Sequence, residues 1–239
     1  MATRASAAVS ASPSRAAVPL DNREGQLLAI ARRLFALRGF EGTSLRDIAQ
    51  EAHITKAALY YYFPNKDALY ERVVIESLES LLESVGAEVA RAGTPTERVR
   101  AFMRASSDFL SHKRDQWLAG SNAFWQASQV DRRDEALGLR DAYEKLLRRC
   151  IADGIAAGEF RQMDAAMAGR LLLSALNHLP RWHLPEGRLS PQEVMDQFLD
   201  MVLLGMVKRP GDEAVGRSAA APRKEAARPA KPAKVLQKA

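Results

Sequence analysis

The sequence predicts an all-α protein with two helical domains. Apolar residues recur at three- and four-residue spacing along most of the 239-residue chain, capping residues precede these stretches, and no segment alternates as a β-strand does. We expect an N-terminal arm over 1–20, a three-helix domain over 21–74, a larger helical domain over 75–209 and a basic tail over 210–239. Arm and tail carry few large apolar residues, so both are predicted to be disordered.

The first helix is predicted to begin at Asp21, whose carboxylate can cap it while Glu24 occupies the reciprocal capping position. Gly39 is expected to end this helix. Its apolar face is formed by Leu27, Ile30, Ala31, Leu34 and Phe35. This face is expected to support the segment that follows.

Residues 43–66, TSLRDIAQEAHITKAALYYYFPNK, are predicted to form two short helices joined by a tight turn. Thr43 or Ser44 can cap the first of these helices, and Thr55 can cap the second. The apolar positions expected to face the core are Leu45, Ile48, Ala49, Ala58, Leu59 and Phe63. The outward positions of the second helix are Lys56, Ala57, Tyr60 and Tyr61, whose ammonium and hydroxyl groups suit phosphates and base edges. The pattern indicates a helix-turn-helix.

The stretch from Leu27 to Val74 resembles the DNA-binding domain of TetR-type bacterial transcriptional regulators. Two motifs carry the resemblance, Arg-Gly-Phe-x-Gly-Thr-Ser before the first short helix and Leu-Tyr-Tyr-Tyr-Phe-Pro-Asn-Lys-Asp-Ala-Leu at the end of the second. The chain departs from the family in the turn, where His53 replaces the usual glycine. We therefore expect His53 to adopt a positive φ at a modest energetic cost.

The resemblance implies which residues meet DNA. Those expected at phosphates are Thr43, Ser44, Tyr60, Tyr62 and Lys66. Those expected nearest the bases are Thr55, Lys56, Ala57 and Tyr61, with Arg46 on the preceding helix as a further candidate. The alternative for the tyrosines is aromatic packing between helices, and we expect at least one of the three to pack inward.

Further helices are predicted over 66–85 and beyond, 96–112, 115–129, 134–157, 164–179 and from 191 onward, with a loop over 180–189. Asn65, Thr94 and Ser190 are expected to cap three of them. The fourth helix of the chain begins at Lys66 beside the helix-turn-helix and ends inside the second domain. A tilt of this helix would therefore move the recognition helix.

Aromatic residues of the second domain lie at helical spacing, which more often indicates a core than a pocket. The resemblance nevertheless implies a ligand cavity between these helices, with candidates Phe102, Phe109, Trp117, Phe124, Trp125, Tyr143, His178, Arg181 and Trp182. The segment Asn177 to Met206, particularly Trp182 to Pro191, resembles the end of members responding to acyl-coenzyme A thioesters. In this chain Arg181, His183 and Arg188 near the loop would then meet the phosphates of the carrier. The alternatives are that this loop only orients neighbouring helices, or that another apolar effector binds.

The last two helices carry more apolar surface than one small bundle covers, and the resemblance implies a homodimer interface there. The expected interface residues are Leu172, Ala175, Leu176, Leu179, Phe198, Met201, Val202 and Gly205. A dimer would present two recognition helices to a palindromic operator.

Composition excludes several other classes. The tail from Lys208 carries nine basic and three acidic residues, which equals the whole net charge of +6, so DNA affinity must come from a local patch. One cysteine, Cys150, excludes an internal disulfide and is expected to be a buried apolar residue rather than a redox sensor. No catalytic motif, metal-ligand spacing, cofactor motif or membrane span is present, and we expect a cytoplasmic protein. The rival function is an architectural DNA-binding protein without an effector.

Overall fold

The computed structural model describes residues 20–126, 133–184 and 186–206, and within these ranges the chain forms nine α-helices and no β-strand. The helices are α1 Leu20–Arg38, α2 Leu45–Glu51, α3 Lys56–Tyr62, α4 Lys66–Arg91, α5 Pro95–His112, α6 Arg114–Gln126, α7 Arg133–Ala156, α8 Ala165–Trp182 and α9 Pro191–Met206. The predicted all-α fold is confirmed. The arm over 1–19 and the tail from 207 lie outside the described residues.

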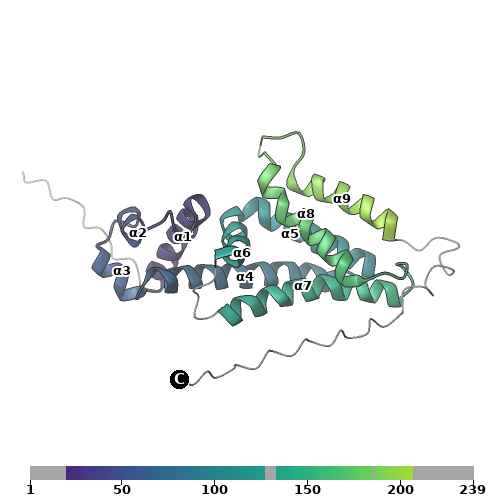
Figure 1. Cartoon of the computed structure of the whole chain (residues 1–239), viewed down its shortest axis with the longest axis horizontal. Coiled ribbons are helices and arrows are strands. Elements are labelled where there is room, and N and C mark those ends of the chain that lie inside the picture. The colour runs from purple at the N-terminus through teal and green to yellow at the C-terminus, as the bar shows by residue number, and fades with distance from the viewer. Residues whose placement is uncertain (1–19, 127–132, 185, 207–239) are drawn as a thin grey trace, which may run out of the picture.

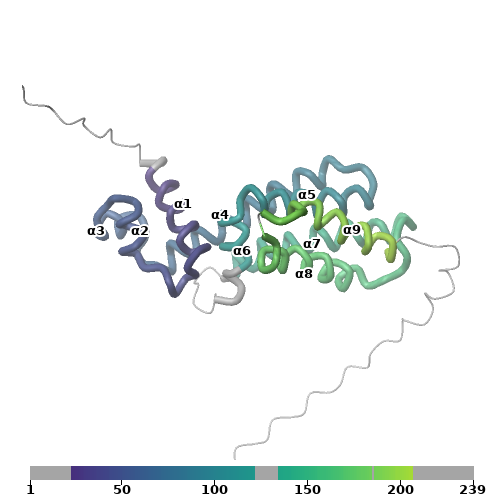
Figure 2. The backbone as a smooth tube through the Cα atoms, turned by 90° about the horizontal axis from the view of Figure 1, so that it is seen from above, coloured from purple at the N-terminus to yellow at the C-terminus, as the bar shows by residue number. Residues whose placement is uncertain are grey.

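The molecule is elongated, with α1 to α3 at one end, α5, α7, α8 and α9 at the other, and α4 running between them (Figure 1). α6 lies between the two groups and packs on both α1 and α4 (Figure 2). Within the described ranges, no helix is long and apolar enough to cross a membrane.

Capping residues set the helix starts. Ser44 and Thr94 each form a capping box, with Asp47 and Glu97 as the reciprocal acids. Hydrogen bonds from Ser44 lower the pKa of Asp47, and those from the backbone of Thr94 and Gly93 lower the pKa of Glu97. These carboxylates are therefore held in the charged form that favours a helix N-terminus.

The start of α1 and the end of α8 differ from the prediction. α1 begins at Leu20, one residue before the proposed cap Asp21. α8 continues through Pro180 to Trp182, where the sequence predicted a loop from Pro180. Proline lacks an amide donor, but near the end of a helix this costs one hydrogen bond, and the amide of His183 still bonds the carbonyl of Leu179. The connection to α9 is correspondingly shorter.

The described helices enclose two hydrophobic cores. The N-terminal core joins α1 to α3 with the first half of α4, and it also includes Leu78 of α4 and Ala119 of α6. The C-terminal core joins α4 to α9, from Leu81 onward, and includes Trp117 of α6 and Cys150 of α7. Cys150 is buried as predicted, and burial raises the pKa of its thiol.

Close packing at one glycine fixes the end of α7. A Cβ atom on Gly154 would lie 2.3 Å from Cδ2 of Phe160, whose ring is 1% exposed in the C-terminal core. The backbone amides of Glu159 and Phe160 both bond the carbonyl of Gly154. Glycine at 154 therefore allows the chain after α7 to fold back onto the helix.

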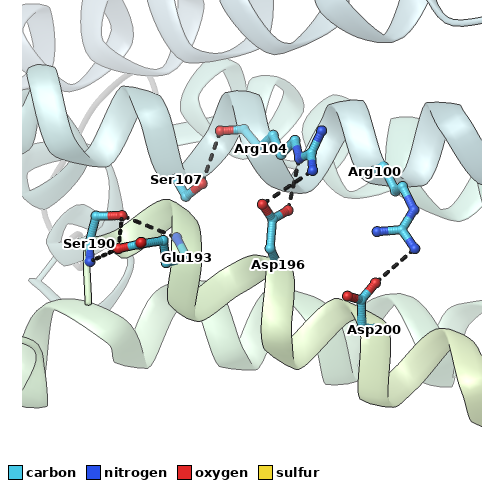
Figure 3. Close-up of polar contacts among 7 residues, drawn as sticks. All are labelled: Arg100, Arg104, Ser107, Ser190, Glu193, Asp196 and Asp200. Atoms are coloured by element: carbon cyan, nitrogen blue, oxygen red, sulfur yellow. Dashed lines mark hydrogen bonds and ion pairs between the residues drawn. The ribbon is translucent and has the colours of Figure 1, made fainter. Parts of the chain in front are cut away.

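Ion pairs hold α9 against α5 (Figure 3). Arg104 donates to both carboxylate oxygens of Asp196, at 2.8 and 3.2 Å. Nη2 of Arg100 lies 2.7 Å from Oδ1 of Asp200. The pairs are largely exposed, so each contributes up to about 1 kcal/mol. They fix the register of α9 along α5.

Candidate nucleic-acid interface and effector cavity

The turn between α2 and α3 has the predicted conformation. His53 adopts a φ of 53° within the turn, as its replacement of the family's glycine led us to expect. Its amide bonds the carbonyl of Gln50, and the next amide, of Ile54, bonds Ala49. Positive φ is uncommon outside glycine but tolerated by histidine, so the turn is kept without glycine.

α3 presents one buried and one exposed side. Leu59 is buried, and Phe63, directly after the helix, is also buried in the N-terminal core. Thr55 caps the helix through its hydroxyl, which accepts from the amide of Ala58 at 3.1 Å. The predicted outward residues, Lys56, Ala57, Tyr60 and Tyr61, are all exposed. Ala58 is exposed as well, so its predicted place in the core was wrong; it lies in the first turn, ahead of the point where α3 meets α2.

The three tyrosines have different environments. Tyr61 is 81% exposed and Tyr60 is 44% exposed, with Nζ of Lys56 lying 5.4 Å from the Tyr60 ring centroid. Tyr62 is half-buried, and its ring lies 5.4 Å edge-on to Tyr61 and 6.5 Å from Phe63. One tyrosine thus packs inward while two remain on the surface.

Thr43 is placed differently from the prediction. It is 1% exposed, and its hydroxyl donates to the carbonyls of Gly39 at 2.9 Å and Leu34 at 3.2 Å. A hydroxyl used in this way cannot meet a phosphate, so Thr43 instead ties the end of α1 to the start of α2. Ser44 and Arg46 are exposed, and Ser44 is the residue that caps α2.

Lys66 also makes an internal contact that the sequence did not predict. Its Nζ donates to the carbonyl of Phe40 at 3.0 Å and lies 3.9 Å from the centroid of the Phe40 ring. The ammonium has three donors, and this contact occupies one of them. Lys66 therefore links the first turn of α4 to the segment between α1 and α2.

A small chamber lies between α4, α6, α7 and α8, with a volume of about 70 Å³. It is lined by Ser77, Leu78, Leu81, Gln116, Trp117, Gly120, Ser121, Arg140, Tyr143, Glu144, Leu173 and Asn177. A larger cavity of about 670 Å³, which we name the outer groove, adjoins it and is lined by Leu118, Ser121, Arg140, Ser174, Asn177, His178, Pro180 and Arg181. Ser121, Arg140 and Asn177 line both, so the chamber and the outer groove share a wall.

The structure brings part of the predicted ligand set to these cavities. Trp117 and Tyr143 line the chamber, and His178 and Arg181 line the outer groove. Residues buried in the C-terminal core and absent from both linings are Phe102 and Phe109. Phe124 and Trp125 belong to α6, but their side chains lie outside the described residues.

Trp182 at the end of α8 and the described residues of the loop that follows are in neither lining. Trp182 is half-exposed, with its ring centroid 6.2 Å from that of Phe198 on α9. A ring nitrogen of His183 lies 2.7 Å from the carbonyl of Leu189, so this histidine spans the loop internally. Arg188 is exposed. These positions correct the expectation that the loop residues border the ligand.

Sequence reasoning missed Gln116, Arg140 and Asn177. Arg140 precedes Tyr143 by three residues and Leu147 by seven, so it lies on their buried helical face, and this spacing could have identified it. Burial lowers the pKa of Arg140, while the nearby Glu144 and Asp141 raise it. An arginine stays charged at neutral pH, so the chamber has a cationic side.

Comparison with known proteins identifies the family. A model described as "Bacterial regulatory proteins, tetR family" matches residues 27–73, and one described as "Tetracyclin repressor-like, C-terminal domain" matches 92–206. The solved TetR-family regulator PfmR from Thermus thermophilus is 30% identical, with 77% of this chain and 99% of PfmR covered and a TM-score of 0.67. The chain belongs to the TetR family. It is a DNA-binding transcriptional regulator and not an enzyme.

Other TetR-family proteins are similar over most of the chain. The HTH-type transcriptional repressor KstR2 of Mycolicibacterium smegmatis is 28% identical over 193 residues, with 80% of this chain and 94% of KstR2 covered. The structure of the ketosteroid transcriptional regulator KstR2 of Mycobacterium tuberculosis has a TM-score of 0.71 at 28% identity, covering 82% and 100%. The structure of AibR in complex with isovaleryl coenzyme A and operator DNA has a TM-score of 0.69 at 25% sequence identity, with 75% of this chain and 97% of AibR covered.

The apolar surface of this TetR-family chain differs in detail from the predicted interface. Leu172, Leu176 and Leu179 are 0–1% exposed in the chain's own C-terminal core, so they are not available to a partner. The large apolar side chains that are more than half exposed on α8 and α9 are Met167, Leu171, Trp182, Met201 and Leu204. Of the other predicted residues, Gly205 is exposed and Ala175, Phe198 and Val202 are half-buried.

For this TetR-family protein, Lys66→Ala is expected to lower the free energy of unfolding by about 1.5–3 kcal/mol, because a hydrogen bond from a charged donor is lost. Lys56→Ala is the control, since Lys56 is exposed and makes only a 5.4 Å contact with the Tyr60 ring. Urea unfolding measures both variants. Equal stability of the two would show that the Phe40 contact contributes nothing.

Proposed function

We propose that this TetR-family protein is a repressor that binds a palindromic operator as a homodimer and is released by a small apolar effector. The observation that carries the proposal is that one continuous helix, α4, begins directly after the exposed helix α3 and also lines the chamber. DNA contact and effector binding would thus share a structural element, and a ligand that favours one position of α4 would shift the regulator between two states.

The proposed DNA surface consists of exposed residues of α2, α3 and their caps. They are Ser44, Arg46, Thr55, Lys56, Ala57, Tyr60 and Tyr61, with the half-buried Tyr62 and Lys66 beside them. Hydroxyl, ammonium and guanidinium donors gathered on one short helix and its neighbour suit phosphate contact, and the side chains of α3 reach base edges when the helix lies in the major groove.

The coupling is proposed to pass through α6 as well as α4. Trp117 lies in the C-terminal core and Ala119 in the N-terminal core, so α6 is packed into both. A Cβ atom on Gly120 would lie 3.2 Å from Cδ2 of Leu78, which shows how closely α6 approaches α4 beside the chamber. A ligand that displaces α6 would therefore also displace α1 or α4, since well-packed cores do not deform continuously.

The dimer is proposed to form through the exposed apolar side chains of α8 and α9. Met167 and Leu171 on α8, with Met201 and Leu204 on α9, would each bury substantial apolar area against a second copy. Two-fold symmetry would then bring two α3 helices to adjacent major grooves about 34–36 Å apart.

The effector class we propose is an acyl-coenzyme A thioester. AibR, similar to this chain, was solved with isovaleryl coenzyme A and operator DNA. In this chain Arg140, His178 and Arg181 line the outer groove, where a guanidinium pair can bind phosphates. The apolar chamber beneath would take the acyl group.

The DNA-binding proposal is tested with Tyr61→Ala and its matched control Tyr61→Phe, which keeps the ring and removes only the hydroxyl. We expect Tyr61→Ala to weaken operator binding by about 1–3 kcal/mol and to reduce discrimination among operator variants. Fluorescence anisotropy with excess random duplex measures both. Unchanged affinity of the alanine variant would contradict the assigned DNA surface, and binding abolished by random duplex would favour the architectural alternative.

A further inference from the structure

Two buried polar atoms on α6 have no hydrogen-bond partner among the described residues. They are Oε1 of Gln116 and the indole Nε1 of Trp117. Trp117 is only 4% exposed, and both residues line the chamber. An unpaired buried polar group is costly, and nearly all such groups in folded proteins find a partner. A ligand that supplies an acceptor to Trp117 and a donor to Gln116 would remove this cost.

Two other polar side chains of the chamber, those of Tyr143 and Ser77, are already engaged. The hydroxyl of Tyr143 lies 2.6 Å from that of Ser106, and Ser77 donates to the carbonyl of Val73 at 2.6 Å. The apolar walls are formed by Leu78, Leu81 and Leu173. The chamber thus combines apolar walls with the buried indole donor of Trp117 and the buried side-chain carbonyl acceptor of Gln116.

The size of the chamber limits what enters it. A volume of about 70 Å³ corresponds to roughly five to seven water-sized groups at 10–15 Å³ each. This is room for a short acyl group, and far less than the roughly 300–1,000 Å³ that encloses a drug-sized ligand. A fused-ring or long-chain group would have to lie in the outer groove among Arg140, His178 and Arg181.

We propose, building on the effector site above, that the chamber selects the short acyl group of a thioester and that Trp117 and Gln116 are the residues that recognise it. The thioester carbonyl oxygen accepts from Nε1 of Trp117. An amide N–H of the pantetheine arm, a few atoms beyond the sulfur, donates to Oε1 of Gln116. Arg140 lies where the chamber meets the outer groove, and Arg181 and His178 line the groove where the carrier's phosphates lie.

The test is calorimetric titration of the full chain with isovaleryl-coenzyme A, palmitoyl-coenzyme A, free coenzyme A and isovalerate. We expect isovaleryl-coenzyme A to bind most tightly of the four. Trp117→Phe is expected to weaken that binding roughly fivefold or more, because the carbonyl loses its donor. Equal binding by this variant, or tighter binding of palmitoyl-coenzyme A than of isovaleryl-coenzyme A, would overturn the inference.

A matched variant separates recognition from a structural role. Trp117→Phe removes the indole donor but also leaves a cavity in the core, whereas Tyr143→Phe removes only a hydroxyl that is already paired with Ser106 in the same chamber. Thioester binding is therefore expected to be weakened by Trp117→Phe and to be little changed by Tyr143→Phe; equal weakening by the two variants would overturn the inference. Release of the operator by another effector, with all thioesters inert, would refute the thioester but leave the repressor function intact, whereas failure to bind any operator would refute the function itself.

Discussion

Leu171→Glu combined with Met201→Glu is expected to convert the protein to a monomer and to weaken operator binding at least about a hundredfold. Both side chains are about 60% exposed in the single chain, one on α8 and the other on α9. A carboxylate buried against a partner without a counter-charge costs several kcal/mol, which exceeds what the lost apolar area alone would cost. A monomer then has one recognition helix and can occupy only one half-site.

Sedimentation velocity and operator titration measure the two effects, and circular dichroism tests for unfolding. The fold should be retained because neither side chain belongs to a core of its own chain. For this reason Leu171 and Met201 are better probes than Phe198 and Val202, which pack against the C-terminal core. Ala152→Glu, an exposed change on α7, is the control. A dimer that persists in the double variant would place the interface on another surface.

Gly154→Ala is expected to lower the free energy of unfolding by about 1–3 kcal/mol, because the added methyl group overpacks a well-filled core. Its Cβ would lie 2.3 Å from Cδ2 and 2.4 Å from Cε2 of Phe160, and the ring is enclosed in the C-terminal core. The backbone and the ring would both have to move.

Gly138→Ala on the same helix is the matched control and should raise the free energy of unfolding. No atom lies within 4 Å of a Cβ placed on Gly138, and this residue is exposed. Alanine in an exposed helix interior is favoured over glycine by roughly 0.5–1 kcal/mol. Denaturant unfolding of the two variants gives the comparison. A stabilising Gly154→Ala would mean that the turn after α7 is loosely packed.

Local signals predicted much of the fold. The capping roles of Ser44, Thr55, Asn65, Thr94 and Ser190 are reproduced, because a cap depends on residues within one helical turn. The inward and outward sides of α3 followed from periodicity except at Ala58. Positive φ at His53 followed from a single residue in a turn otherwise typical of the family.

Tertiary contacts were not readable in the same way. α8 contains three consecutive leucines, Leu171 to Leu173, so periodicity alone could not decide whether Leu171 or Leu172 faces the chain's own core. Lys66 and Phe40 are separated by 26 positions in sequence, and no local pattern predicts that they meet. The chamber residues Gln116 and Arg140 come from different helices, and their proximity depends on how α6 and α7 pack on α4.

Because α4 is continuous, the DNA-binding domain of this regulator cannot be exchanged as a module that ends at residue 74. The N-terminal core extends along α4 to Leu78 and takes in Ala119 of α6, while the C-terminal core starts only three residues later, at Leu81. A chimera joined between residues 74 and 75 would separate the N-terminal core from Leu78 and Ala119 and pack it against residues of another protein. The DNA specificity of α3 can therefore be transferred to another regulator in two ways. Either only exposed residues of α3 are exchanged, or α1 to α4 are exchanged together with the α6 residues that pack on them.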